Sequence, residues 1–241
     1  MSLSMSFHQQ PKKQTGVLTI GRTRALAKDF REMVASHVDN DVSVDAACYS
    51  SSLNSNKQPD QYRAIVIVVD SLQAFSESIA LIEALRVENM ASIIMTAFTG
   101  TGTFSKIKYY LAGADYCMKF DAADENDGLL SEIFSSLEWQ KKDNLILDPT
   151  RMCLIGNDKK LDISFAEMKI LEAFSQTKSH ILSHDEIARV MSLNINFYDP
   201  RALEKSISRL RRKIKDMCGV NAILSIRGYG YRLIRGLIAT T

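Results

Sequence analysis

Cysteine is scarce in this chain, and its spacing excludes a disulfide framework or a cysteine metal cluster. Four cysteines occur in 241 residues, and none of them forms a C-x-x-C pair: Cys48, Cys117, Cys153 and Cys218. His180 and His184 are four residues apart, but Ser183 begins a predicted helix between them, so we expect a surface pair and not a zinc site. Isolated thiols suit a reducing cytosol. The sequence therefore predicts structural cysteines and no metal site.

Long apolar runs are also absent. No stretch approaches the roughly 18 consecutive apolar residues that a membrane span requires, and residues 1–16 contain no apolar signal core. Residues 1–15 are instead expected to form a disordered leader. With 46% hydrophobic and 24% charged residues, the chain has the composition of an ordinary globular protein. We expect a cytoplasmic protein of one or two domains with no membrane partner.

The chain lacks the phosphate-binding loops of common nucleotide enzymes. Its best candidate, Gly100–Lys106, reads Gly-Thr-Gly-Thr-Phe-Ser-Lys and matches neither G-x-x-x-x-G-K-[ST] nor a G-x-G-x-x-G after the first strand. We therefore expect that the protein is not an enzyme. A nucleotide-binding or enzymatic N-terminal half stays as an alternative, and protection by a nucleotide against thermal unfolding would reveal it.

Charge is unevenly divided between the two halves of the chain. From Leu145 onward the sequence holds 16 Lys or Arg against 10 Asp or Glu, whereas the preceding part holds 14 against 18. The second half is thus net +6 and the first half net −4, although the whole chain is only +2. A basic surface attracts polyanions such as nucleic acid and an acidic one does not. The two halves are therefore expected to have different tasks.

A helix with one apolar and one cationic face is predicted from Pro200 to Lys215. Asp199 can cap its first turn, and Pro200 suits the first helical position. Apolar residues recur at helical spacing: Leu203, Ile207, Leu210 and Ile214. At about 100° per residue, the opposite face carries four cations: Arg201, Lys205, Arg209 and Arg212. Such a helix can enter a DNA major groove, although a solvated charged face is the plainer interpretation.

Residues 16–140 have the pattern of an α/β domain with a doubly wound, five-stranded parallel sheet. Short apolar runs alternate with helical periodicity. The predicted strands are 17–20, 42–48, 65–69, 92–95 and 116–118, and the predicted helices are 24–37, 76–87, 106–111 and 129–139. Ile65–Val69 is β-branched throughout and should form the buried central strand. Ser50–Asp60 is rich in Ser and Asn and is a weak helix or a loop.

Residues 145–236 have the pattern of a smaller α+β domain, joined to the first by a polar linker at 141–144. Three short strands are predicted at 145–147, 152–155 and 160–163. Helices 165–176 and 185–191 each follow an S-x-x-E capping box, and these boxes are Ser164 with Glu167 and Ser183 with Glu186. The basic helix comes next, and a hairpin of residues 223–226 and 231–234 follows. This order of elements is that of a winged helix-turn-helix.

The second half resembles the effector domain of OmpR/PhoB-type response regulators. The matching motifs are Ser164–Glu167, Ile207–Lys213 and Ile226–Arg232. The resemblance implies a bacterial transcription regulator whose third helix enters the major groove of double-stranded DNA at tandem promoter half-sites, with the wing in the minor groove. The residues at DNA-contacting positions are Arg201, Lys205, Ser206, Arg209, Arg211, Arg212, Ser225 and Arg227. It also implies RNA polymerase as a candidate partner, through the loop 191–199.

Not every polar or aromatic residue of this region is expected to contact DNA. By helical angle, Arg211 lies on the flank of the helix, where a phosphate contact suits it better than a base contact. Lys213 and Lys215 are expected to be solvated charges. Tyr229 and Tyr231 are expected to pack within the wing and not to stack on bases.

The first half resembles a receiver domain, with departures at its reactive edge. In receivers the aspartate at the end of the third strand attacks a phosphodonor, and Asp70 stands at this position. Two acidic residues after the first strand hold Mg²⁺, but these positions here read Gly21-Arg22. The hydroxyl after strand four and the lysine after strand five correspond to Thr96 and Lys119. The resemblance thus includes the phosphoacceptor position but not the metal ligands.

Loss of the acidic pair should disable phosphoryl transfer, because the reaction needs a divalent cation anchored by carboxylates. We therefore expect no bound Mg²⁺, no other cofactor, and little or no phosphorylation of Asp70 by the usual route. Our hypothesis is that Arg22, with Lys119, pairs with Asp70 and mimics the neutralised site. Two alternatives stay open: a strand-end carboxylate without function, and a regulator gated by phosphorylation of Asp70, with a sensor histidine kinase and an unconventional metal site.

Without a phosphate switch, the receiver-like half is expected to hold two copies together. Relatives dimerise through the fourth helix, fifth strand and fifth helix, which correspond here to residues 106–140. The region is rich in apolar side chains that could form the interface: Phe104, Tyr109, Tyr110, Leu130, Phe134 and Trp139. The sequence therefore predicts a homodimeric transcription regulator that acts independently of aspartyl phosphorylation.

Overall fold

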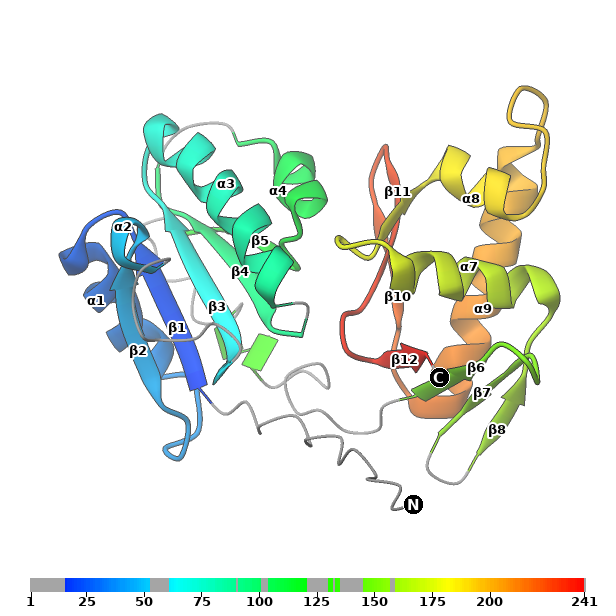
Figure 1. Cartoon of the computed structure of the whole chain (residues 1–241), viewed down its shortest axis with the longest axis horizontal. Coiled ribbons are helices and arrows are strands. Elements are labelled where there is room, and N and C mark those ends of the chain that lie inside the picture. Colours follow the sequence, from blue (N-terminus) through cyan, green and yellow to red (C-terminus); the bar gives the residue numbers. More distant parts are fainter. Residues whose placement is uncertain are drawn as a thin grey trace, which may run out of the picture.

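The structure is a computed structural model that describes residues 16–52, 61–89, 91–100, 104–120, 130–131, 133–134, 145–156 and 159–240. The predicted leader 1–15, the linker 141–144, Trp139 and part of Gly100–Lys106 lie outside this set. The described residues form two units that lie side by side (Figure 1). None of their helices combines the length and the apolarity needed to cross a bilayer.

The first unit is built on a five-stranded parallel sheet. Its strands are β1 (Gly16–Gly21), β2 (Val44–Cys48), β3 (Tyr62–Val69), β4 (Ile93–Phe98) and β5 (Tyr116–Lys119). They are arranged in the order β2-β1-β3-β4-β5, and every neighbouring pair is parallel. β3 therefore lies in the centre, and Ile65–Val69 is fully buried, as the β-branched run predicted. The doubly wound fold is confirmed.

Helices cover both faces of this sheet (Figure 1). α3 (Leu72–Glu88) and α4 (Lys106–Ala112) pack on one face, and α1 (Arg24–Ala35) packs on the other with Leu130 and Phe134. α3 begins four residues earlier than predicted, because the Ser71 hydroxyl accepts a hydrogen bond from the Ala74 N–H and caps the first turn. The weak helix expected after β2 is a single turn, α2 (Tyr49–Ser52).

The second unit is the predicted winged helix-turn-helix. Its strands are β6 (Leu145–Asp148), β7 (Cys153–Ile155), β8 (Lys160–Asp162), β9 (Ile181–Ser183), β10 (Ile223–Ile226), β11 (Gly230–Leu233) and β12 (Ile238–Thr240), and its helices are α7 (Phe165–Gln176), α8 (His184–Val190) and α9 (Pro200–Cys218). Both capping boxes form. In the first, the Ser164 hydroxyl accepts from the Glu167 N–H at 3.2 Å, and the Ser164 N–H donates to the Glu167 carboxylate at 2.8 Å. The antiparallel hairpin β10–β11 is the wing.

Two strands of the second unit were not expected from the sequence. β9 pairs antiparallel with β11, and β12 pairs parallel with β6. Each is only three residues long, which is too short to show an alternating pattern, and each exists because a neighbouring strand offers an open edge. The sheet containing β6 therefore continues to Thr240, beyond the 145–236 range expected for this unit.

α9 docks against the second unit by one narrow stripe. Leu203, Ile207, Leu210 and Ile214 are at most 1% exposed, and they belong to one core with Leu171 and Phe174 of α7. The stripe holds the helix in a single rotation about its axis, because turning the helix would expose these four side chains. The rotation in turn decides which residues of α9 face solvent.

Shortening one side chain of this stripe should destabilise the second unit. Ile207→Ala leaves a cavity in a fully buried position, so we expect the free energy of unfolding to fall by about 2–5 kcal/mol. Ser208→Ala, at the adjacent exposed position, should change it by less than about 0.5 kcal/mol. Urea unfolding followed by circular dichroism measures both. Equal effects of the two substitutions would contradict the docking of α9 through this stripe.

Candidate functional site

The candidate DNA-binding surface is the solvent-facing side of α9. Asp199 caps the helix by accepting a hydrogen bond from the Arg201 N–H at 3.0 Å, and Gly219 ends it in a left-handed conformation. All four cations predicted on the outer face are exposed: Arg201, Lys205, Arg209 and Arg212. None of the four forms an ion pair with the part of the chain that the structure describes. These cations are therefore available to an external polyanion.

The wing supplies a second cationic element. Arg227 is exposed at the β10–β11 turn, where Gly228 has a φ of 73° that favours glycine. Ser225 is exposed on β10, and its hydroxyl accepts a hydrogen bond from the Arg211 guanidinium at 3.1 Å. Arg211 also lies 5.9 Å from the centre of the Tyr231 ring. Arg211 thus ties α9 to the wing, and Tyr231, at 7% exposure, packs as predicted.

Two further predicted positions are held by local contacts. The Ser206 hydroxyl, half-buried, donates to the Ala202 carbonyl at 3.0 Å, one turn earlier in α9. Lys213 is not the solvated charge that was expected, because its Nζ lies 2.7 Å from the Glu167 carboxylate on α7. Burial alone would raise the pKa of Glu167, but the hydrogen bond from Lys213 and the Ser164 N–H lower it. The α7 capping box is thereby linked to α9.

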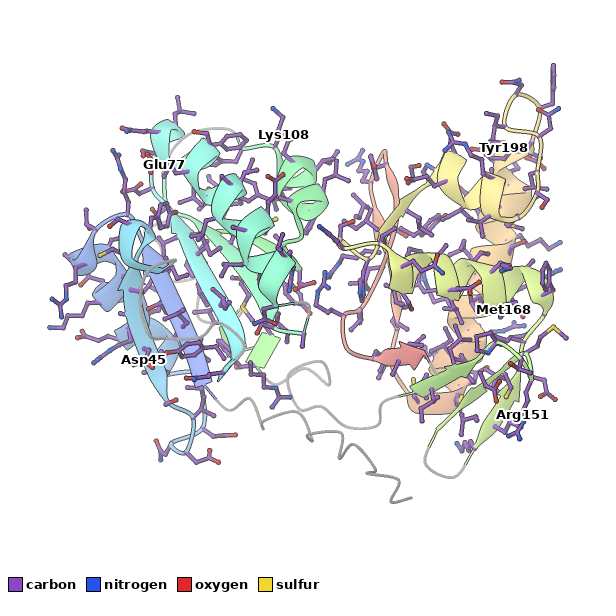
Figure 2. The ribbon with its side chains drawn as sticks, viewed as in Figure 1. Asp45, Glu77, Lys108, Arg151, Met168 and Tyr198 are labelled. Atoms are coloured by element: carbon purple, nitrogen blue, oxygen red, sulfur yellow. The ribbon has the colours of Figure 1, made fainter. Side chains whose placement is uncertain are left out.

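At the reactive edge of the receiver-like unit, Asp70 follows β3 directly and is half-buried, with the Ser71 hydroxyl 3.1 Å from its carboxylate. The hypothesis that Arg22 pairs with Asp70 is wrong. The Arg22 Nε lies 4.0 Å from the carboxylate of Glu77, which belongs to α3 and is labelled in Figure 2. Arg22 and Glu77 line a pocket of about 500 Å³ with Tyr49, Ser50, Ala80 and Leu81. Arg22 therefore lies on the α2–α3 side of this edge, where it faces Glu77.

The hydroxyl and lysine positions also differ from the expectation. Thr96 is fully buried inside β4, and its hydroxyl donates to the Tyr116 carbonyl of β5 at 3.1 Å. The hydroxyl residue that follows β4 is Thr99, because this strand extends to Phe98 and not to Met95. Lys119 is exposed at the end of β5 and has a contact of its own. The contacts of Arg22 and Thr96 are thus with residues other than Asp70.

The residues at this edge do not fit a magnesium ion. Mg²⁺ needs several oxygen ligands with carboxylate anchors, but the positions after β1 offer Gly21 and the cation Arg22. A Cβ at Gly21 would lie 2.8 Å from the Ala27 backbone nitrogen in α1, so the start of α1 occupies the space that an aspartate side chain would need. Among the described residues, no three His, Cys, Asp or Glu side chains gather into a metal-binding group.

The sequence analysis missed a buried cluster of charges where the two units meet. At its centre, Asp115 of the α4–β5 loop is 1% exposed. Its carboxylate accepts hydrogen bonds from Arg86 of α3 at 2.5 Å and from the Ile94 N–H at 2.8 Å, both in the first unit. It also accepts one at 3.0 Å from Arg235, which follows β11 in the second unit. Burial alone would raise the pKa of Asp115, but the guanidinium groups of Arg86, Arg235 and Arg232 lower it to about 2.

Arg232 of β11 completes this charge cluster. Its Nη1 lies 3.5 Å from the Asp115 carboxylate, and its guanidinium lies over the rings of Tyr110 and Tyr116 at 5.9 and 5.2 Å. The wing hairpin lies on the side of the second unit that faces the first (Figure 1). Sequence patterns could not reveal the cluster, because its members come from distant segments: Asp115 and Arg235 alone are 120 positions apart.

His180 lies beside the same cluster and is not the surface residue that was expected. Burial and the nearby Arg235 lower the pKa of His180 to about 4, and Arg86 and Arg232 contribute in the same direction. Asp115 raises this pKa but offsets the other effects only in part. Its backbone has a φ of 54° and its Nδ1 has no hydrogen-bond partner in the described structure. The folded protein therefore favours the neutral imidazole.

Acidification should destabilise the protein through His180. The unfolded chain takes up this proton near pH 6.5 and the folded chain only near pH 4, so the stability contributed by the neutral imidazole is present above pH 6.5 and is lost as the pH falls toward 4. Between pH 8 and pH 5 the loss should be about 2 kcal/mol. His180→Asn, which tolerates a positive φ, should reduce this slope in urea titrations. A variant that loses as much stability as the wild type would contradict the assignment.

Comparisons with known proteins agree with the geometry of the second unit. Residues 158–233 match the family model described as "Transcriptional regulatory protein, C terminal". AfsQ1 of Streptomyces coelicolor is 28% identical over 91 residues, which cover 37% of this chain and 40% of the relative. This chain thus spans less than half of AfsQ1. PcoR of Escherichia coli is 25% identical over 179 residues, which cover 70% and 77% of the two chains.

One of the solved structures to which this chain is similar is DrrB of Thermotoga maritima, described as a response regulator and OmpR/PhoB homologue. It is 16% identical, covers 90% of this chain and 98% of its own, and has a TM-score of 0.39. The family match and the helix–wing geometry together assign the second unit. Residues 158–233 thus match the C-terminal domain of transcriptional regulatory proteins and have a winged helix-turn-helix fold, and a five-stranded parallel α/β unit precedes them.

Proposed function

We propose that this protein is a bacterial, cytoplasmic, sequence-specific DNA-binding transcription regulator that acts as a homodimer on tandem promoter half-sites, without aspartyl phosphorylation. The observation that carries the proposal is the exposed cationic side of α9 on a helix whose opposite side is buried. A major groove accepts an α-helix of this kind, and lysine and arginine side chains displace counterions from phosphates.

The cations differ in how freely they can read bases. Arg201, Lys205 and Arg209 have no competing ion pair in the described structure. A free guanidinium can form two hydrogen bonds with guanine, so Arg201 and Arg209 are the candidates for base contacts. Arg211 already donates to Ser225, so its remaining donors suit a phosphate beside the wing. Arg227 at the wing tip is the candidate for the minor groove.

Independence from phosphorylation is supported by the reactive edge of the first unit. The start of α1 fills the space for a ligand at position 21, and position 22 holds a cation that pairs with Glu77. Phosphoryl transfer to Asp70 would lack the cation that offsets charge on the transferring oxygens. We therefore propose that neither Mg²⁺ nor a sensor histidine kinase is needed for DNA binding.

The proposed dimer surface is smaller than the sequence suggested. Tyr109, Leu130 and Phe134 are core residues and cannot form an interface, because they fill the space between helices and sheet. The exposed apolar residues of α4 are Ile107, at 36%, and Leu111, at 45%. These two, with the half-buried Tyr110, are the candidates for contact with a second copy.

RNA polymerase is a second candidate protein partner. The loop between α8 and α9 presents Phe197 at 85% exposure and Ile195 at 43%. Figure 2 shows its labelled residue Tyr198 on this projecting loop, and the Tyr198 hydroxyl donates to Asp185 of α8 at 3.3 Å. Exposed aromatic and aliphatic side chains on a projecting loop suit a protein contact better than DNA.

Removing one cation of α9 should weaken DNA binding. If Arg209 contacts a base, Arg209→Ala should weaken the free energy of DNA binding by about 1–3 kcal/mol and relax the sequence preference. If Arg209 contacts a phosphate, the substitution should instead reduce the salt dependence of the affinity by about one counterion. Arg151→Ala removes the same charge from an exposed residue at the β6–β7 turn and should have little effect. Fluorescence anisotropy on operator DNA, found by footprinting, at several salt concentrations measures both. Equal affinities of the two variants would contradict the assignment.

Phosphodonor should not change the behaviour of the wild-type protein. With acetyl phosphate and Mg²⁺, we expect the same sedimentation coefficient and the same DNA affinity as without them. A phosphate-dependent shift that Asp70→Asn abolishes would instead support the phosphorylation-gated alternative. Arg22→Asp replaces the cation that pairs with Glu77 by a carboxylate after β1, on the same sheet edge as Asp70, and should produce Mg²⁺ binding in a calorimetric titration, whereas an unchanged titration would count against the role assigned to Arg22.

A further inference from the structure

We infer that the charge cluster between the two units is a binding site for one small inorganic anion, held by the Arg232 guanidinium beside Asp115. A halide ion such as chloride or bromide has the charge and the size that the site requires. The site is separate from the proposed DNA-binding surface, because Arg232 is buried against Tyr110 and Tyr116 of the first unit. It is therefore independent of the proposed function.

Three guanidinium groups share the single carboxylate of Asp115. Arg86 donates to its Oδ2 at 2.5 Å, and Arg235 donates to its Oδ1 at 3.0 Å. Arg232 approaches the same Oδ1 at 3.5 Å, but its Nη1 does not form a hydrogen bond there. Within the described residues, Arg86 and Arg232 form ion pairs with no other acid. Two guanidiniums against one carboxylate leave one positive charge, even before Arg235 is counted.

The cations of the cluster are desolvated but still charged. The side chains of Arg86, Arg232 and Arg235 are at most 4% exposed. Burial lowers the pKa of Arg86 to about 10, although Asp115 opposes the shift and the two neighbouring guanidiniums add to it. Arg86 therefore stays protonated at neutral pH. A buried charge without an ionic partner is strongly unfavourable, so the unneutralised charge of the cluster requires a further anion.

The Arg232 guanidinium has a hydrogen-bond donor that no described residue uses. Its Nη1 is buried and has no hydrogen-bond partner in the part of the chain that the structure describes. The guanidinium lies 5.9 and 5.2 Å from the ring centres of Tyr110 and Tyr116. A ring face attracts a cation but gives its N–H groups no oxygen acceptor. An anion at Nη1 supplies both the missing acceptor and the missing charge.

His180 provides a second buried nitrogen of this kind. Its Nδ1 also has no partner among the described residues. The His180 carbonyl accepts a hydrogen bond from the Leu233 N–H at 2.9 Å, and Ile181 is the register partner of Arg232, so the two segments run side by side. A neutral imidazole donates from Nδ1 in one of its two tautomers. The second unit thus brings two unused donors to the cluster.

The chemistry of the site favours a halide over the other small acceptors. A water molecule accepts a hydrogen bond from Arg232 but carries no charge to offset the guanidinium. Phosphate and sulfate are larger, and their full hydration shells are costly to remove in a junction whose charged side chains are almost completely buried. A monatomic, weakly hydrated anion pays less for its removal from water and fits between close-packed side chains.

The test compares thermal unfolding of the full wild-type chain with Arg232→Gln and with Arg151→Gln, which removes an exposed guanidinium. Bromide replaces fluoride at constant ionic strength and at pH 8, where His180 is neutral. Above the dissociation constant, each tenfold rise in bromide should raise the Tm of the wild type by roughly 3 to 5 °C more than that of Arg232→Gln. Arg151→Gln should respond as the wild type does.

A crystal of the wild-type chain grown in bromide locates the ion. We expect an anomalous difference peak beside the Arg232 Nη1. If Arg232→Gln does not fold, Arg232→Lys replaces it, because lysine keeps a charge and loses the planar pair of donors. This variant should need about tenfold more bromide for the same rise in Tm.

The outcomes separate the anion from its alternatives. Equal responses to bromide in the wild type and in a folded Arg232 variant would overturn the site. Solvent density at the Arg232 Nη1 without an anomalous signal would do the same, because a water molecule then completes the cluster. A larger rise in Tm with sulfate than with bromide at equal ionic strength, lost in the Arg232 variant, would overturn the halide and assign an oxyanion. A peak at Arg232 together with the lost response in the variant supports the proposal.

Discussion

The burial of one stripe of α9 is the constraint on which the DNA-binding unit depends. Leu203, Ile207, Leu210 and Ile214 share a core with α7 and α8, so they fix both the position and the rotation of the helix. Once this rotation is set, the cations at positions 201, 205, 209 and 212 must face solvent. The neighbouring contacts refine the placement: Lys213 joins α9 to the capped start of α7, and Arg211 joins it to the wing. The cationic surface is thus a consequence of apolar packing, and the charges at positions 201, 205, 209 and 212 do not themselves hold the helix in place.

At the end of β1, a glycine and an arginine stand where the resemblance to receiver domains implies two carboxylates. With glycine at position 21, the N-terminal turn of α1 approaches β1 so closely that any side chain there would meet backbone. With arginine at position 22, the remaining space is used for a pair with Glu77, on the α2–α3 side. The five-stranded parallel sheet is nevertheless complete. What stays is an α/β unit whose buried Asp115 pairs with Arg235 of the second unit.

Periodicity predicted most of the fold. The buried β3, the capped α7 and the apolar stripe of α9 could all be predicted from the sequence, because each is a local pattern of burial or capping. The three-residue strands β9 and β12 were not, because they carry no pattern and form only against an existing edge. The same limit applies to the sites. The four outward cations of α9 follow from helical angle alone, whereas the pairing of Arg22 and the cluster around Asp115 depend on which distant segments meet. Arg232 occupies an ordinary strand position in the sequence and becomes a buried interdomain contact only in the folded chain.

On the proposed function, DNA itself can do the work that a phosphoryl group does in a regulator with an intact receiver. A copy bound at one half-site holds its neighbour at the adjacent half-site at a high effective concentration, which favours contact between the two first units. Binding free energy from two cationic helices then supports a contact that is weak by itself, and the coupling needs no covalent signal. A stronger contact between the copies would associate them without DNA, and a weaker one would leave single copies at single sites.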